Sequence, residues 1–101
     1  MRDIKLSKRA VRRLQELLEY LDNEWSESVK KKFVKELDQS LRLIRRNPAS
    51  FPKTDFVKSL HRCVVTKHIT LYYTYDESTV FIVTLFDNRQ NPQRINKEIT
   101  P

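Results

Sequence analysis

The sequence contains no glycine and a single cysteine, Cys63, in 101 residues. Without glycine the chain cannot build the glycine-rich phosphate loops of P-loop or Rossmann sites, so nucleotide binding of those kinds is excluded. Turns that need a positive φ must use Asn, Asp or another non-glycine residue. One cysteine excludes an intrachain disulfide, and its place among alternating apolar residues favours a buried, inert thiol over a nucleophile.

Long apolar runs are also missing. No stretch approaches the ~20 apolar residues that a membrane-spanning helix needs, and residues 1–20 are charged throughout, unlike a signal peptide. From these features we expect a cytoplasmic protein with no membrane partner. At this length the chain should form one domain over residues 1–101, with residues 93–101 as a loose or short helical tail.

Acidic residues are fewer than basic ones: Asp and Glu total 13 against 20 Lys and Arg, which gives a net charge of +7. Most of the excess lies in residues 1–58. A basic domain attracts nucleic acid or an acidic partner chain, but the same charge also serves solubility. Composition alone leaves both interpretations open.

Residues 2–6 alternate between charged and apolar side chains, which predicts a short strand with Ile4 and Leu6 facing inward. Ser7 follows this strand and is a favourable N-cap residue. From Lys8 the apolar residues recur at steps of three and four, which is the period of an amphipathic helix.

This first helix is expected to end near residues 23–25, and Ser26 is expected to cap a second helix that stops at Asn47 and Pro48. Two amphipathic helices joined this closely should form an antiparallel hairpin. The apolar positions expected to face the core are Val11, Leu14, Leu17, Leu18, Leu21 and Trp25, followed by Val29, Phe33, Leu37, Leu41 and Ile44. The residues expected on the opposite, exposed face of the first helix are Arg9, Arg12, Arg13, Glu16 and Glu19.

After a loop over residues 47–59 the apolar period changes to that of strands, predicted at residues 60–67, 69–75 and 79–86. Short connections make these an antiparallel meander. The predicted fold class is α+β, in the order β-α-α-β-β-β, with the helical hairpin packed on one face of a mainly antiparallel sheet. The other face and the sheet end are left partly open for a site. The residues expected on one face of the middle strand are Ile69, Leu71, Tyr73 and Tyr75.

Several short motifs occur in a specific order along the chain. They are Trp25-Ser26; Phe33 with Leu37; Ile44-x-x-Asn47-Pro48-x-x-Phe51-Pro52; Leu60-x-Arg62-x-x-Val65-x-Lys67-His68-x-x-Leu71-Tyr72-Tyr73; and Ile82-Val83-x-Leu85-Phe86-Asp87-x-Arg89-Gln90-Asn91-Pro92. With these motifs the chain resembles the RelE/ParE superfamily of bacterial toxins from type II toxin–antitoxin modules, over roughly residues 3–95. The fold that this resemblance implies agrees with the one predicted from the periodicity.

The resemblance implies one of two activities. RelE-like members are ribosome-dependent endoribonucleases that cut mRNA, and ParE-like members act on DNA gyrase. Metal-free RNA cleavage needs a base, a cation at the phosphorane and an acid. Arg89 matches the family's arginine after the last strand and is the candidate catalytic cation. The tyrosine expected about six residues later is absent, since Ile95 stands there, and His61 or His68 is the candidate substitute because imidazole titrates near neutrality.

Whether the chain is an enzyme is therefore left open; if it is one, the resemblance implies a metal-independent endoribonuclease. The middle-strand positions at which RelE-type enzymes carry lysines and an arginine hold His61, Arg62, Cys63 and Thr70 here. No metal or other cofactor is expected.

The partner implied by the resemblance is a cognate antitoxin, with mRNA on the ribosome or DNA gyrase as the possible target. The candidate residues for binding nucleic acid or a partner are Arg62, Lys67, Tyr72, Arg89 and Arg94. A third possibility is a degenerate, non-toxic protein that only binds an antitoxin.

Overall fold

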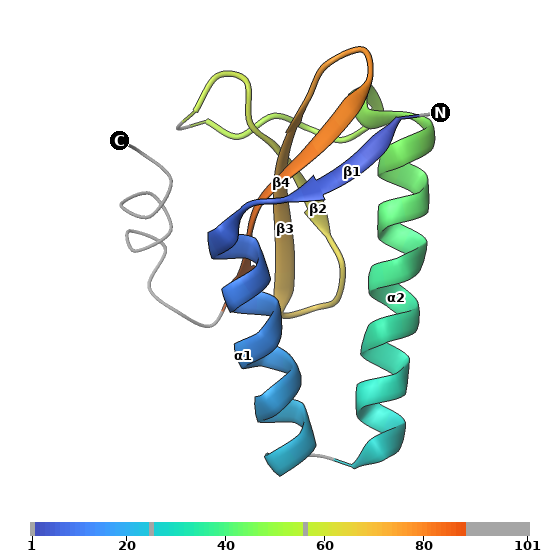
Figure 1. Cartoon of the computed structure of the whole chain (residues 1–101), viewed down its shortest axis with the longest axis vertical. Coiled ribbons are helices and arrows are strands. Elements are labelled where there is room, and N and C mark those ends of the chain that lie inside the picture. The colour runs from blue at the N-terminus through green and yellow to red at the C-terminus, as the bar shows by residue number, and fades with distance from the viewer. Residues whose placement is uncertain (1, 25, 56, 89–101) are drawn as a thin grey trace.

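The computed structural model describes residues 2–24, 26–55 and 57–88, and these form two helices and a four-stranded sheet (Figure 1). The elements are β1 (Asp3–Leu6), α1 (Lys8–Glu24), α2 (Glu27–Arg46), the 3-10 turn η1 (Pro48–Ser50), β2 (His61–Val64), β3 (Ile69–Tyr75) and β4 (Thr79–Asp87). The predicted α+β class and the order β-α-α-β-β-β are confirmed. None of the described helices is long and apolar enough to cross a membrane.

Both predicted N-caps are present. The Ser7 hydroxyl accepts the Ala10 N–H at 2.9 Å and donates to the Val83 carbonyl at 2.6 Å, so it caps α1 and ties it to β4. The Ser26 hydroxyl accepts the N–H of Val29 at 3.4 Å. The second helix ends at Arg46, as predicted from the Asn47–Pro48 pair that follows it.

The strands are ordered β1-β4-β3-β2, with β2, β3 and β4 antiparallel and β1 parallel to β4. The mainly antiparallel sheet is thus confirmed. The strand predicted over residues 60–67 is shorter and ends at Val64. The prediction was too long because Thr66 organises a turn: its side chain accepts the N–H groups of His68 and Ile69 at 3.2 and 3.1 Å.

The main core lies between the helical hairpin and one face of the sheet. Its buried members are Ala10, Leu21, Phe33, Ile44, Cys63, Val65, Ile69, Leu71, Tyr73, Val80, Ile82 and Leu85. The predicted inward face of β3 is confirmed, since Ile69, Leu71 and Tyr73 belong to this core and Tyr75 packs against it. Cys63 is buried, as expected.

Some predicted core positions are wrong. Leu6, Val11 and Val29 are 38%, 41% and 39% exposed, whereas Ala10 is fully buried. Successive helical residues point about 100° apart, so the face of α1 that packs on β4 includes Ala10 and turns Val11 toward solvent.

The opposite sheet face carries a smaller apolar cluster of Leu60, Tyr72 and Phe86, with Val57 and Val83 packed against it. The chain between η1 and β2 runs beside the edge of the sheet, where the Arg62 N–H donates to the Pro52 carbonyl at 2.9 Å. This segment therefore supplies part of the cover of the face that the helices leave free.

The β3–β4 turn is organised by Asp76, whose side-chain oxygen accepts the N–H groups of Ser78 at 2.9 Å and Thr79 at 2.8 Å. The bond from Ser78, followed by that from Thr79, lowers the pKa of Asp76 because both favour the charged carboxylate. Arg2 adds a smaller effect in the same direction.

A lowered folded-state pKa means that Asp76 stabilises the fold above its unfolded pKa, and that this contribution disappears as pH falls through the folded-state value. Asp76→Asn keeps an acceptor oxygen but does not titrate. As the pH is lowered from about 5 through the folded-state pKa of Asp76, we therefore expect the free energy of unfolding to fall less in this variant than in the wild type. Urea unfolding monitored by circular dichroism measures it. If the free energy of unfolding fell equally steeply with pH in the two proteins, the stabilising role of the Asp76 carboxylate would be contradicted.

Candidate functional site

The C-terminal end of β4 meets the β2–β3 turn. The last strand pair joins Asp87 to Ile69, and the next residue, Asn88, donates its N–H to the His68 carbonyl at 2.6 Å. The Thr70 hydroxyl donates to the Asn88 side-chain oxygen at 2.9 Å. The candidate cation Arg89 follows Asn88 in the sequence, and both Arg89 and Arg94 lie outside the described residues.

The β2–β3 turn presents two of the predicted site residues. Lys67 and His68 are both exposed on it, and the turn is held by the Thr66 side chain. Because the His68 carbonyl receives the Asn88 N–H, this histidine lies beside the chain that leads to Arg89. The fold therefore brings His68 and Lys67 to the end of β4.

His61 lies elsewhere. It pairs with Tyr73 on the helix side of the sheet, is only 5% exposed, and stacks on the Tyr73 ring at 5.3 Å between centroids. Its Nδ1 lies 2.7 Å from the Phe51 carbonyl oxygen. These contacts join the segment before β2 to the sheet, and they separate His61 from the surface on which His68 lies.

The sheet face away from the helices holds the other predicted residues. Arg62 is exposed and pairs with Tyr72, which is 8% exposed. Burial raises the pKa of the Tyr72 phenol, and the charge of Arg62 partly opposes the rise. Thr70 is 4% exposed. Of the four middle-strand positions, Arg62 and Thr70 belong to this face, while His61 and Cys63 turn toward the helices.

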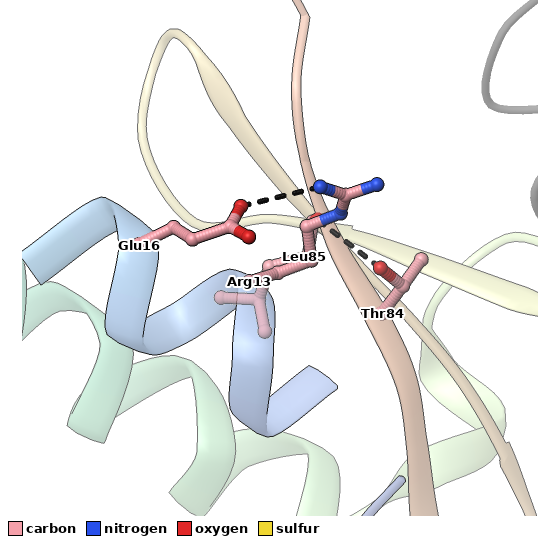
Figure 2. Close-up of polar contacts among 4 residues, drawn as sticks. All are labelled: Arg13, Glu16, Thr84 and Leu85. Carbon is pink, nitrogen blue, oxygen red and sulfur yellow. Dashed lines mark hydrogen bonds and ion pairs between the residues drawn. The ribbon is translucent and has the colours of Figure 1, made fainter. Parts of the chain in front are cut away.

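A cleft of about 340 Å³ separates α1 from the end of β4. Figure 2 shows Arg13 reaching from α1 over β4 while its guanidinium bonds to Glu16 at 3.2 Å. The residues that line the cleft are Arg13, Glu16, Leu17, Tyr20, Ile69, Leu85, Phe86 and Asp87. Sequence reasoning placed Arg13 and Glu16 on the exposed helix face and missed this cleft, because the helical period does not show how far a long side chain reaches.

An adjoining groove of about 420 Å³ lies between both helices and the β2–β3 turn. Its apolar wall comes from Leu17, Leu21, Val29, Phe33, Val65 and Ile69, and its polar rim comes from Tyr20, Lys32, Glu36, Thr66, Lys67 and His68. Figure 1 shows the turn beside the helices at the end of the sheet. The groove combines exposed apolar surface with two lysines.

Residues 4–92 match the sequence model of a family described as the ParE toxin of the type II toxin–antitoxin system parDE. The chain belongs to the ParE toxin family. It is therefore a toxin of a type II toxin–antitoxin system, and the predicted membership of the RelE/ParE superfamily is confirmed. No curated protein is significantly similar to this ParE-family chain in sequence.

Solved structures confirm the fold of this ParE-family toxin. A chain from the chromosomal ParDE system of P. aeruginosa is similar with a TM-score of 0.71 and 9% identity, covering 86% of this chain and 96% of that one. The YoeB dimer of Staphylococcus aureus is similar with a TM-score of 0.59 and 22% identity, covering 84% of this chain and 94% of that one. A chain of the E. coli DinJ–YafQ toxin–antitoxin complex is similar with a TM-score of 0.61 and 13% identity, covering 87% of this chain and 93% of that one. At these identities the likeness concerns the fold.

Proposed function

We propose that the chain inhibits growth by binding DNA gyrase, and that it does so without cleaving RNA. The observation that carries this proposal is the orientation of the middle-strand positions. Among the described residues of β2 and β3, the sheet face away from the helices has Arg62 as its one cation, whereas His61 is buried on the other side. Cleavage without a metal needs a base and an acid beside the cation, and this face supplies neither from an exposed histidine.

Binding needs only groups that contact the target, whereas cleavage also needs an acid and a base. A protruding arginine recognises carboxylates or phosphates through a rigid fork of donors, and such residues are frequent hot spots of interfaces. In this proposal Arg89 is the main contact with the target. Lys67 and His68 are exposed on the turn that bonds to Asn88, and they add positive or titratable side chains beside the end of β4.

A second candidate function is mRNA cleavage on the ribosome, in which Arg89 stabilises the phosphorane. The hydrogen bond between the Asn88 N–H and the His68 carbonyl favours it, because that bond joins the backbone of a residue with an exposed imidazole to the residue before Arg89. His68 would then serve as the acid or base.

Induced expression in bacteria separates these functions. Gyrase inhibition predicts growth arrest with a DNA-damage response and altered plasmid supercoiling, while reporter mRNAs stay intact. Arrest with cut mRNA and normal supercoiling would support the second candidate instead. Full tolerance of expression without any antitoxin would overturn both and favour the degenerate antitoxin-binding protein.

We also propose a cognate antitoxin as the partner that neutralises the chain, and the groove between the helices and the β2–β3 turn as part of its docking surface. Two of the similar solved structures are toxin–antitoxin complexes, DinJ–YafQ and YoeB–YefM. The groove offers apolar surface for a partner segment, and Lys32 and Lys67 on its rim suit acidic side chains.

Lys67→Glu is expected to weaken binding of the antitoxin encoded beside the toxin, by about tenfold at low salt, and to make the remaining affinity less dependent on salt. Titration calorimetry at two salt concentrations measures both effects. Lys35→Glu is the matched control, since Lys35 is also exposed but lies on α2, outside the residues that line the groove. Equal losses in the two variants would mean that net charge, and not the groove, governs binding.

A further inference from the structure

We propose that Thr70 and Asn88 form a clamp that holds the end of β4, next to Arg89, in the arrangement that target inhibition needs. The inference rests on the proposed function, because it gives a reason for the arrangement of residues next to Arg89. Neither residue is expected to touch the target itself, so both are positioning residues. The clamp consists of two hydrogen bonds that join the end of β4 to the start of β3.

The first bond runs through the backbone. The Asn88 N–H donates to the His68 carbonyl at 2.6 Å, one residue beyond the last strand pair between Asp87 and Ile69. That carbonyl is itself held in place, because the Thr66 side chain accepts the N–H groups on both sides of it, those of His68 and Ile69. The sheet thus continues its hydrogen bonding up to the residue before Arg89.

The second bond fixes the side chain. The Thr70 hydroxyl is buried at 4% exposure and donates to Asn88 Oδ1 at 2.9 Å. A buried hydroxyl that loses its partner is costly, so Thr70 favours the Asn88 conformation in which the bond forms. Asn88 is exposed, and Thr70 therefore connects the sheet interior to a residue at the surface.

A single peptide bond joins Asn88 to Arg89, so holding Asn88 at two points fixes where the chain leaves the sheet. Restricting a contact residue before binding lowers the entropy that binding must overcome, and it improves affinity without adding a contact. The expected role of the clamp is to keep the end of β4 in one arrangement before the target binds.

Thr84 provides a matched control. It is also a buried threonine, fully so, in the neighbouring strand β4. Its hydroxyl donates to the Leu85 carbonyl at 3.2 Å within the same strand, as Figure 2 shows, and does not reach Asn88. Thr84→Val therefore replaces a buried hydroxyl by a methyl group, as Thr70→Val does, without affecting the clamp.

The test compares purified variants in a gyrase supercoiling assay and by amide hydrogen exchange followed by NMR. Thr70→Val and Asn88→Ala are expected to raise the inhibitory concentration about five- to tenfold, the value of one hydrogen bond. Thr70→Ser keeps the donor and Asn88→Asp keeps the acceptor, so both should retain inhibition. The double variant Thr70→Val/Asn88→Ala should lose no more than either single one, because the two residues act through one bond.

The hydrogen-exchange rate of the Asn88 amide tests the clamp independently of inhibitory activity. The Asn88 amide should exchange faster in Thr70→Val than in the wild type or Thr84→Val. Unchanged exchange in Thr70→Val would overturn the clamp, and faster exchange with unchanged inhibition would overturn its positioning role. Equal losses of inhibition in Thr70→Val and Thr84→Val would also overturn that role. A wild type that leaves gyrase unaffected would overturn the proposed function and the positioning role together, while the exchange rates would still decide whether the two residues hold Asn88.

Discussion

Arg89→Ala is expected to restore growth to cells that express the chain and to weaken gyrase inhibition by about 30- to 1,000-fold, the loss of a typical interface hot spot of about 2–4 kcal/mol. The reason is that, among the described residues of β2 and β3, Arg62 is the one cation on the sheet face away from the helices, and we propose that the main contact with the target comes from the arginine after β4. The effect is measured as colony formation after induction and as the concentration of purified variant that halves supercoiling.

Arg89→Lys separates charge from shape, because lysine keeps the charge but lacks the planar fork of donors. It should recover only part of the inhibition. Arg42→Ala is the control for loss of a surface arginine, since Arg42 forms an exposed pair with Asp38 on α2 at 3.0 Å and such pairs contribute little. Arg89→Ala with wild-type inhibition would contradict the assignment of this residue as the main contact.

Tyr73→Ala is expected to destabilise the fold by about 3–5 kcal/mol, a large part of the stability of a small domain. Tyr73 is fully buried, and its hydroxyl donates to the Pro48 carbonyl at 2.6 Å. Its ring stacks on His61 and meets Phe51 edge to face at 6.4 Å. One side chain therefore joins β3 to the chain between α2 and β2. Burial raises the pKa of its phenol, because it disfavours the charged phenolate, which could not donate this bond.

Tyr73→Phe isolates the hydroxyl. It keeps the ring contacts but leaves the buried Pro48 carbonyl without this donor, and we expect a loss of about 1–3 kcal/mol. Urea unfolding followed by circular dichroism gives both values. A phenylalanine variant that loses as much as the alanine variant would contradict the account, because it would assign the whole effect to the hydroxyl.

The helices and the order of elements along the chain could be predicted because their signals are local. Ser7 and Ser26 are cap residues next to amphipathic runs, and Asn47-Pro48 ends a helix by steric restriction of the backbone. The parallel pairing of β1 with β4 could not be predicted in this way. Ile4 pairs with Val80 across most of the chain, and no local pattern records that contact.

The candidate site was less predictable, because it depends on which strands pair and in which register. A shift of one residue moves every side chain of a strand to the other face, and each face of β2 carries one polar and one apolar side chain. Only the pairing of His61 with Tyr73 shows that this histidine is buried while Arg62 is not. The contact between Thr70 and Asn88 likewise appears only once β3 and β4 are paired.

The most direct measurement of the central claim is a supercoiling assay with purified gyrase and the purified chain. We expect the wild type to inhibit supercoiling in a concentration-dependent manner and the cognate antitoxin to restore gyrase activity. We also expect mRNA on translating ribosomes to stay uncut at the same concentration. Normal supercoiling together with cleaved mRNA would contradict the claim.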